Sequence, residues 1–530
     1  MMLLKNDLTD RIRRLTKIGI ALSAEKDINN FFKMVLNEAV DFTNSDAGTM
    51  YWVTDDKKYL EFKFVCTLSK NLSLGSADVA KWPNIPLYKD NGEKLMRTFV
   101  SYVTHTAKPK SIDDVYYQDV FDNSGTKKYD AANNYRSVSM AAIPLKNHED
   151  DVLGVIQLIN TMDEKGNIIP FSEDSIAVLT SLASQAAIAM TNKTLIDGLE
   201  NLLNQFIKSI AFALDRKSKY TGGHIERVAT LTEMLAQKIQ TDEHSYKNIH
   251  FSDNELQEIS IAGWMHDIGK ITTPVYIMDK AKKLETIFDR IGLVELRFEL
   301  IESIINKDII VSQHNSETNK VAKSKKSLEK MQKYLEFIKK TNTGGEFLPD
   351  EDLELLDEIL SFEYISDGKK YKLITDEEMK NLAIRRGTLL AEEIEKMREH
   401  ALISHEMLQK LTFPKKFKNV PKYASGHHEK LNGKGYPLGI NEEELPLQSR
   451  MLAITDLYEA LTAVDRPYKK GKTLTESLRI MAFCAKDHEI DKDLLNLFID
   501  SELYLEYAKK FLNDYQIDEV DIDKIKALYN

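Results

Sequence analysis

The chain has 530 residues, of which 42% are hydrophobic and 29% are charged, and its formal net charge is −11 at pH 7. This length exceeds what one hydrophobic core supports, so we expect two or more domains. The acidic balance argues against a binder of nucleic-acid polymers, and two distant cysteines argue against a disulfide framework and for a cytoplasmic location. Because no apolar run reaches about 18 residues and the N-terminus has no signal-peptide pattern, we predict no membrane span.

The first 190 residues mix helical and strand patterns and predict an α+β domain. Apolar residues recur at helical spacing over residues 8–40. Residues 47–53 and 59–66 predict two strands, and residues 69–134 predict loops with short helices. Two apolar segments, 137–145 and 152–160, flank a charged turn and predict a hairpin. Together these segments indicate an antiparallel sheet with flanking helices.

The hairpin sequences SVSMAAIPL and LGVIQLIN, followed by a long helix, resemble a GAF domain, which is a small-molecule sensor with a central antiparallel sheet. We therefore assign residues 1–190 to a GAF-like sensor domain. Some cyclic-nucleotide-binding members carry an Asn-Lys pair, then Phe, then Asp-Glu. This chain keeps Asn160 and Phe171, but Thr161 replaces the Lys and the acidic pair Glu173-Asp174 is reversed. The resemblance implies a small-molecule ligand, and these departures argue against a cyclic nucleotide as the ligand of the GAF-like domain.

A continuous helical pattern runs from about residue 172 to residue 214, and its part at 191–214 connects the two halves of the chain. Its apolar residues step by three and four, which is the spacing of an a/d stripe. The stripe consists of Ile196, Leu199, Leu203, Phe206, Ile210 and Ala213. Such a stripe packs either on its own domain or on a second copy of the chain. We favour a parallel homodimer helix that carries a sensory change into the second half.

The second half predicts an all-helical domain at residues 215–480, followed by a helical tail at 481–530. Residues 220–228 lead into an expected amphipathic helix that ends near residue 239, and a second helix is expected from residue 253 or 255 to residue 266. About a hundred residues at 285–389 then separate motifs that belong side by side, which indicates a helical insertion. The insertion contains a Lys-rich helix at 321–340, a Gly344-Gly345 break and an acidic helix at 350–360. Its charges are typical of a solvated face.

Histidines and carboxylates recur in the second half in a pattern that is unusual for a soluble core. Two adjacent histidines, His427 and His428, precede a Gly-rich turn, and Asp456 lies inside an apolar run. Upstream, a His-Asp pair stands at the end of a predicted helix. Neutral imidazoles and carboxylates on buried helices are the ligands that a multi-metal hydrolytic centre needs. The candidate ligands are His224, His266, Asp267, His400, His427, His428 and Asp456.

The ordered motifs resemble the HD-GYP family, a subset of the HD-domain phosphohydrolases associated with cyclic di-GMP breakdown. The motifs are His266-Asp267-Ile268-Gly269-Lys270, His400, His427-His428-Glu429, Gly435-Tyr436-Pro437 and Asp456. The resemblance covers residues 205–285 and 390–480, on both sides of the insertion. It implies a metal-dependent phosphodiesterase, regulated by the GAF domain, that hydrolyses cyclic di-GMP to linear pGpG, to GMP or to both.

Chemistry and resemblance together suggest a role for each residue. Asp267 would bridge two divalent metals through its two carboxylate oxygens. One metal would be completed by His224, His266 and Asp456, and the other would be held by His400, His427 and His428. The two cations would clamp a phosphate and lower the pKa of a bridging water, and Lys270 would contact a phosphate oxygen as a point charge. The resemblance implies that Tyr436, Arg466 and Lys469 contact the substrate.

The number of metals depends on one position. Family members with three metals carry Glu four residues before the first His, whereas this chain has Tyr220, a poor ligand for a hard divalent ion. We therefore predict two metals per chain. The resemblance implies iron, with manganese, zinc or nickel as alternatives. Asn432 replaces an aspartate that is common before Gly-Tyr-Pro, and we expect the loss of charge to weaken support for the site.

Three alternatives compete with cyclic di-GMP hydrolysis. The nearest is hydrolysis of a mixed cyclic GMP–AMP dinucleotide, which the sequence does not separate from it. The second is a receptor that binds the nucleotide without turnover, although the complete ligand set favours an enzyme. The third is nucleoside-triphosphate hydrolysis, as in other HD proteins. The Gly-Tyr-Pro segment and the Arg-Pro-Tyr-Lys segment at 466–469 argue against it.

Overall fold

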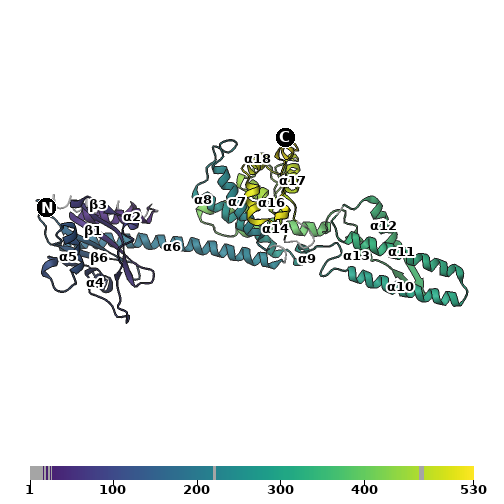
Figure 1. The fold of residues 1–530 in the computed structure, drawn as a ribbon, viewed down its shortest axis with the longest axis horizontal. Coiled ribbons are helices and arrows are strands. Elements are labelled where there is room, and N and C mark those ends of the chain that lie inside the picture. Colours follow the sequence, from purple (N-terminus) through teal and green to yellow (C-terminus); the bar gives the residue numbers. More distant parts are fainter. Residues whose placement is uncertain are drawn as a thin grey trace. The chain divides into compact units, whose positions relative to one another are not determined.

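The computed structural model describes residues 16, 19–21, 24–25, 27–218, 222–345, 347–464 and 471–529. Two compact units follow one another along the chain, Met1–Leu202 and Leu203–Asn530 (Figure 1). The helix α6 (Glu173–Lys217) crosses the division between them. Within the described residues, no helix combines the length and apolar character that a bilayer span requires.

The first unit contains an antiparallel sheet with β1 at its centre. The strands are β1 (Ser45–Val53), β2 (Tyr59–Thr67), β3 (Leu72–Leu74), β4 (Ile85–Pro86), β5 (Lys110–Ile112), β6 (Met140–Lys146) and β7 (Val152–Thr161). Their spatial order is β3-β2-β1-β7-β6-β5, and β4 pairs with β2. The predicted strands and the predicted hairpin are therefore confirmed.

Helices cover both faces of this sheet because alternate strand residues point to opposite sides. On one face, Met50 packs in a core with α2 (Ile28–Thr43) and the first part of α6. On the other face, Tyr51 packs with α4 (Phe99–Thr106), where the rings of Phe99 and Phe121 lie 5.3 Å apart. Two further helices are α3 (Ser76–Val79) and α5 (Ser124–Asn133). The predicted α+β architecture is confirmed.

The residues that suggested comparison with nucleotide-binding GAF domains serve the fold. Asn160 accepts a hydrogen bond from the backbone N–H of Val138 at 2.7 Å and donates one to the carbonyl of Arg136 at 2.8 Å. Phe171 is buried in the sheet core. Glu173 and Asp174 stand in the first turn of α6, where acidic side chains favour a helix N-terminus.

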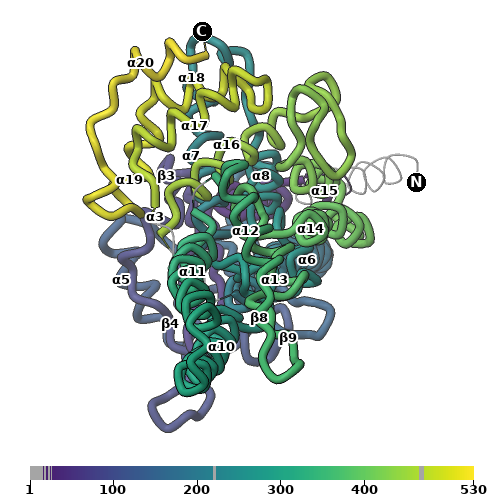
Figure 2. Tube along the Cα trace, turned by 90° about the vertical axis from the view of Figure 1, so that its right-hand side faces the viewer, coloured from purple at the N-terminus to yellow at the C-terminus, as the bar shows by residue number. Residues whose placement is uncertain are grey.

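The second unit is helical, as predicted. Its helices outside the insertion are α7 (His224–Gln240), α8 (Asp253–Met265), α9 (Val275–Met278), α14 (Ala391–Gln409), α15 (Val420–Ser425), α16 (Leu447–Thr462), α17 (Leu474–Lys486), α18 (Lys492–Asp500), α19 (Leu503–Phe511) and α20 (Ile522–Lys526). A 3-10 segment, η3 (Ile268–Thr272), follows α8. Leu235, Tyr458, Phe498 and Tyr507 share one core, so residues after 481 (yellow in Figure 2) pack into the body of this unit.

The insertion has a hydrophobic core of its own. Its elements are α10 (Ile291–His314), α11 (Thr318–Asn342), α12 (Asp350–Ser361), β8 (Glu363–Ser366), β9 (Lys369–Lys372) and α13 (Asp376–Leu382). The helices α10 and α11 run side by side in both views (Figures 1 and 2) and bury Ile301, Ile305 and Tyr334. The hairpin β8-β9 was not predicted from the sequence, although its turn, Asp367-Gly368, is a dipeptide that favours two-residue hairpin turns.

The apolar stripe on α6 divides between two faces. Leu203 and Ile210 pack with Ile207 against the core of the second unit, which is the self-packing alternative. Leu199 and Phe206 instead expose 65% and 63% of their surface. The predicted stripe residues therefore lie partly against the chain's own core and partly at the surface, and the homodimer stays a prediction.

Candidate metal centre

All seven predicted ligands converge in the second unit. They come from the start of α7 (His224), the end of α8 (His266 and Asp267), α14 (His400), the residues after α15 (His427 and His428) and α16 (Asp456). The side chains of His266, Asp267, His400 and His427 expose 2% of their surface or less. Segments far apart in the sequence thus place imidazoles and carboxylates at one buried point.

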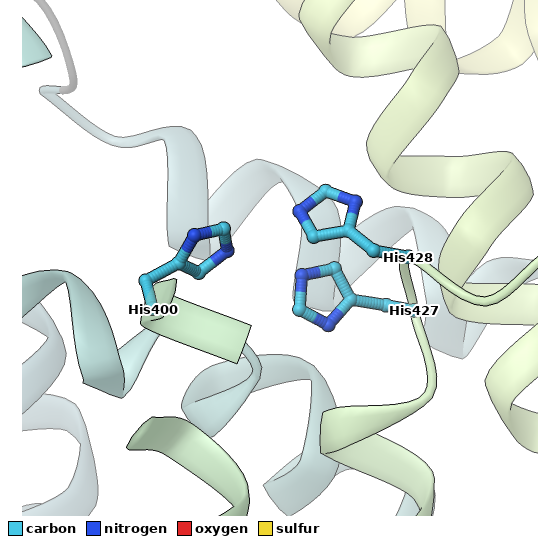
Figure 3. A group of neighbouring side chains, drawn as sticks. All are labelled: His400, His427 and His428. Carbon is cyan, nitrogen blue, oxygen red and sulfur yellow. The ribbon is translucent and has the colours of Figure 1, made fainter. Parts of the chain in front are cut away.

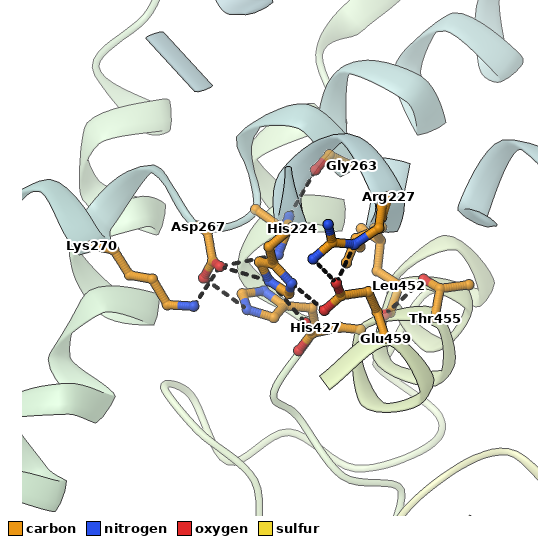
Figure 4. Close-up of polar contacts among 12 residues, drawn as sticks. His224, Arg227, Gly263, Asp267, Lys270, His427, Leu452, Thr455 and Glu459 are labelled. Atoms are coloured by element: carbon orange, nitrogen blue, oxygen red, sulfur yellow. Dashed lines mark hydrogen bonds and ion pairs between the residues drawn. The ribbon is translucent and has the colours of Figure 1, made fainter. Parts of the chain in front are cut away.

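The carboxylate of Asp267 faces imidazoles with both of its oxygens, and Figure 4 shows it beside Lys270, His224 and His427. Its Oδ2 lies 3.3 Å from Nε2 of His224 and 3.3 Å from Nε2 of His266. Its Oδ1 lies 3.3 Å from Nε2 of His400 and 3.9 Å from Nε2 of His427. Each carboxylate oxygen therefore faces a different set of nitrogen atoms.

The two groups have the compactness of metal sites. In His400, His427 and His428 (Figure 3), one ligand atom from each residue lies within 4.8 Å of the others. The same holds for His224, His266 and Asp267. Asp456 extends the second of these groups, because its Oδ1 lies 3.4 Å from Nε2 of His224.

Hydrogen bonds to the backbone orient three of the imidazoles. Nδ1 of His266, His400 and His427 lies 2.7, 2.5 and 2.6 Å, respectively, from the carbonyl oxygen three residues earlier. A carbonyl can only accept a hydrogen bond, so each Nδ1 carries the proton. Each Nε2 then has a free lone pair directed at the centre, which is the usual arrangement of metal-binding histidines.

Four atoms at the centre are buried and have no hydrogen-bond partner among the described residues. They are Nε2 of His266, His400 and His427 and Oδ1 of Asp267. A buried polar atom left unsatisfied costs about 1–3 kcal/mol, so such a cluster calls for a ligand that accepts lone pairs. Divalent cations accept lone pairs from imidazole nitrogen and carboxylate oxygen atoms, so these residues fit a metal ion.

The electrostatics of the centre also suit metal binding. Burial lowers the pKa of His428 to about 3 and that of His427 well below its usual range, so both imidazoles stay neutral. Burial opposes ionisation of Asp267, but the charge of Lys270 and the imidazole of His266 outweigh it and hold the pKa of the carboxyl well below its usual range. Two neutral imidazoles therefore stand beside an ionised carboxylate. Burial opposes protonation of His224, but the carboxylates of Glu459 and Asp267 outweigh it and raise the pKa of this imidazole to about 10, so His224 would release a proton when it binds a metal.

Glu459 holds the ring of His224 in place, a role that was not predicted from the sequence. Its carboxylate is buried and accepts a hydrogen bond from Nδ1 of His224. Arg227 donates to the same carboxylate through Nε at 2.7 Å and Nη2 at 2.6 Å. The pair of Glu459 and Arg227 thus keeps Nε2 of His224 turned toward Asp267 and Asp456.

We expect Glu459→Gln to weaken metal binding by about 10- to 100-fold, because partners behind metal-binding histidines have effects of this size. Metal titration of the apoprotein would measure the change. Glu506→Gln is a matched control, since Glu506 pairs with Lys238 at 3.1 Å and lies outside both groups of ligands. Equal metal affinity in the Glu459 variant and the wild type would contradict this role.

Gly269 allows η3 to pack directly on α14. A Cβ atom at this position would lie 2.0 Å from the carbonyl oxygen of His400 and 2.7 Å from the backbone nitrogen of Ser404. Oγ of Ser404 accepts from the N–H of Gly269 and donates to the carbonyl of His266, both at 2.9 Å. This contact fixes the His-Asp segment against the helix that carries His400.

We expect Gly269→Ala to lower the free energy of unfolding by about 2 kcal/mol or more, because the added methyl group forces these segments apart. Thermal unfolding, followed with metal content, would measure the loss. Gly292→Ala is the control, because a Cβ at Gly292 meets nothing within 4 Å. An unchanged melting temperature for Gly269→Ala would show that the contact is not tight.

Lys270 lies on η3 with its Nζ 2.5 Å from Oδ2 of Asp267. Lys217, in the last turn of α6, holds the backbone of this segment. Its Nζ donates to the carbonyls of Lys270, Ile271 and Thr273 at 2.9, 2.5 and 2.7 Å. The end of α6 therefore contacts the segment that carries the predicted catalytic lysine.

The Gly-Tyr-Pro loop folds around a buried carboxylate. Glu429 accepts hydrogen bonds from the backbone N–H groups of Leu438 at 2.6 Å, Gly439 at 3.1 Å and Ile440 at 3.2 Å. The loop places Tyr436 against His428, with ring centroids 4.8 Å apart in a stacked arrangement. Glu429 was named as part of the His-His-Glu motif, but this role in the loop was not predicted from the sequence.

Asn432 serves the turn before this loop. Its Nδ2 donates to the carbonyl of Asp487 at 2.9 Å, a bond that an aspartate could not make, and its Oδ1 accepts from the N–H of Lys434 at 3.0 Å. Neither partner belongs to the groups of predicted ligands, and the expected weakening of the site by Asn432 stays a prediction.

A cavity of about 890 Å³ opens onto the centre. This volume lies within the range of about 300–1,000 Å³ that small-molecule sites occupy. Its lining includes His224, Lys270, His400, His428, Tyr436 and Asp456. Arg466 and Lys469, which we predicted to contact substrate, and Tyr220, on which the number of metals depends, lie outside the described residues.

Family models match three segments of the chain. A GAF domain model matches residues 27–190, and two HD domain models match residues 221–344 and 374–494. The chain carries a GAF domain followed by an HD domain. The predicted GAF and HD domains are thereby confirmed, and the two HD matches end and begin inside the insertion.

Parts of the chain are similar to parts of several curated bacterial proteins. A "Probable cyclic di-GMP phosphodiesterase" of Vibrio cholerae is 33% identical over 143 residues, which are 25% of this chain and 31% of that protein. A "3'3'-cGAMP-specific phosphodiesterase 3" of the same organism is 37% identical over 95 residues, 18% of this chain and 20% of that protein. A cyclic di-GMP phosphodiesterase of Pseudomonas aeruginosa is 50% identical over 56 residues, 11% of this chain and 13% of that protein. The matches span less than a third of each relative.

Among solved structures, the chain is similar to the GAF domain of an Acinetobacter phosphoenolpyruvate-protein phosphotransferase. The match covers 36% of this chain and 96% of the chain in that structure. The two are 14% identical, with a TM-score of 0.27.

Proposed function

We propose that this protein is a two-metal phosphodiesterase that hydrolyses a cyclic dinucleotide, with cyclic di-GMP as the first candidate. The observation that carries the proposal is the position of Asp267, whose two oxygens face two separate groups of imidazoles. A carboxylate placed between two nitrogen-rich groups could hold two metal ions close together, which suits two-metal hydrolysis of phosphate esters. The HD relatives named above are phosphodiesterases of cyclic dinucleotides, which supports the substrate class.

Each metal would be held by a group of residues that the structure brings together. One site would consist of His224, His266, Oδ2 of Asp267 and Asp456, and the other of Oδ1 of Asp267, His400, His427 and His428. Bound divalent ions would supply a hydroxide at neutral pH and neutralise charge on the phosphate. Iron is the first candidate, and manganese, zinc and nickel suit the same donors.

The chain's own side chains position the substrate. Lys270 points its ammonium group into the centre and would contact a non-bridging oxygen of the phosphate. Tyr436 lines the cavity beside His428 and offers a ring on which a base can stack. Arg466 and Lys469 would contribute further contacts. The GAF domain would regulate turnover through α6, because Lys217 at its end contacts the segment that carries Lys270.

Product analysis tests this function. The metal-loaded protein is incubated with cyclic di-GMP and, separately, with the 3′3′-cyclic GMP–AMP dinucleotide, and products are separated by chromatography. We expect a linear dinucleotide or mononucleotides, and the ratio of kcat/KM values identifies the preferred substrate. Tight binding of either nucleotide without any product would favour the receptor instead, and hydrolysis of nucleoside triphosphates alone would contradict the proposal.

A further inference from the structure

The insertion forms one wall of the cavity above the metal centre. Part of the cavity lining carries metal ligands, and another part comes from residues just before the insertion, from the turn between α11 and α12, and from the end of the insertion. This wall consists of residues 277–281, 343–345 and 386–389. The insertion therefore shapes the space where a substrate would lie, in addition to forming a solvated helical body.

Buried hydrogen bonds hold this wall in place. Nζ of Lys280, whose side chain is fully buried, donates to both carboxylate oxygens of Glu393 at 2.7 and 2.9 Å and to Oδ1 of Asn381 at 3.0 Å. Nζ of Lys283 donates to the carbonyl of Leu382 at 3.0 Å. These bonds tie the residues before the insertion to those at its end.

Two glycine turns meet within the wall. Gly344 and Gly387 both have positive φ angles, +68° and +80°. A Cβ on Gly344 would lie 2.7 Å from Cγ2 of Thr388 and 2.9 Å from the carbonyl oxygen of Gly387. Oγ1 of Thr388 also donates to the carbonyl of Lys280 at 2.9 Å. Arg386, which lines the cavity next to Gly387, thus stands on a turn held by packing and by a hydrogen bond.

Most cations around the cavity already have an anionic partner. Arg227 contacts Glu459, Lys280 contacts Glu393, and Lys270 contacts Asp267. Among the described residues, the guanidinium of Arg386 and the ammonium of Lys472 line the cavity and have no hydrogen-bond or ion-pair partner. The residue before Arg386 differs, because Nη2 of Arg385 lies 2.5 Å from Oδ1 of Asp350.

We propose that Arg386 binds the phosphate of the cyclic dinucleotide that does not lie at the metals. A cyclic dinucleotide carries two phosphodiester groups, and the metal centre with Lys270 engages only one of them. The planar guanidinium suits two oxygens of a phosphate better than the point charge of Lys472 does. The inference rests on the proposed function, and it makes the insertion a determinant of substrate specificity.

The test compares two substrates in the full-length, metal-loaded protein. Arg386→Ala should raise KM for the cyclic dinucleotide about tenfold or more, because it removes a charge-assisted hydrogen bond. Hydrolysis of bis(4-nitrophenyl) phosphate, which has one phosphate, should stay unchanged. Arg386→Lys should restore part of the loss. Arg385→Ala is the matched control and should leave both substrates unaffected, because Arg385 pairs with Asp350 away from the cavity.

Each other outcome is informative. An unchanged KM for the cyclic dinucleotide in Arg386→Ala would overturn the inference, as would an equal loss on both substrates, which would indicate a structural effect. If the wild type binds the cyclic dinucleotide without cleaving it, the same variants are compared by Kd. A wild type that cleaves bis(4-nitrophenyl) phosphate but neither binds nor cleaves cyclic dinucleotides would refute the proposed substrate and, with it, this role of Arg386.

Discussion

Replacing Asp267 with alanine should remove bound metal and turnover together. Both oxygens of this carboxylate face imidazoles, Oδ2 toward His224 and His266 and Oδ1 toward His400 and His427. The substitution therefore removes a donor from both sites at once, and metal content should fall from about two ions per chain to below about one. Elemental analysis and a turnover assay on the same sample measure the two losses, and turnover should fall to the background of the assay.

His405→Ala is a suitable control for this variant. His405 lies on α14, on the same helix as His400, but its Nδ1 contacts Oγ of Ser425 at 3.0 Å and it belongs to neither ligand group. Metal content and turnover should both persist in this control. Turnover by Asp267→Ala close to that of the wild type would show that the bridge between the two groups is not needed for the reaction.

Lys270→Met should separate turnover from metal binding. The methionine side chain has a similar length but no charge, so the donors of both metal groups stay in place while the contact to a phosphate oxygen is lost. We expect kcat to fall by about 100-fold or more, the usual cost of removing one group that stabilises charge in the transition state. Metal content should remain close to that of the wild type, and steady-state kinetics on the metal-loaded variant measure the effect.

Lys270→Arg tests whether the charge alone is sufficient. A partial recovery of kcat is expected, because the guanidinium keeps the charge but differs in shape and reach. If Lys270→Met lost its metals as Asp267→Ala is expected to do, the lysine would act by holding Asp267, which lies 2.5 Å away, and not by contacting the substrate.

The metal ligands could be predicted because their chemistry restricts them to few residue types. The chain has only 12 histidines, and a His-Asp pair, an adjacent His-His pair and a carboxylate in an apolar run stand out among them. Supporting carboxylates are harder to find, because Glu459 and Glu429 are two of 83 acidic residues. Glu459 follows Asp456 by three residues on α16, so helical spacing could have placed both on one face. Nothing in the local sequence marks Glu429 as the residue around which a loop folds.

The fold was predictable where residues repeat with a clear period and was not predictable where distant segments meet. The strands around Met50 and Ile156 alternate or are continuously apolar, and the structure confirms them. The hairpin at Asp367-Gly368 was overlooked between helices despite its turn signal. The contact between Gly344 and Thr388 depends on how the helices and the hairpin between them pack, and no local sequence pattern predicts this packing. The cavity wall that carries Arg386 could therefore be found only in the structure.

The most direct test of the two-metal phosphodiesterase is the metal content of protein purified without oxygen, with turnover of cyclic di-GMP assayed on the same sample. We predict about two divalent ions per chain and a linear product. Turnover by metal-free protein would contradict the metal centre. Two ions with bound but uncleaved nucleotide would contradict the enzyme and favour a cyclic-dinucleotide receptor.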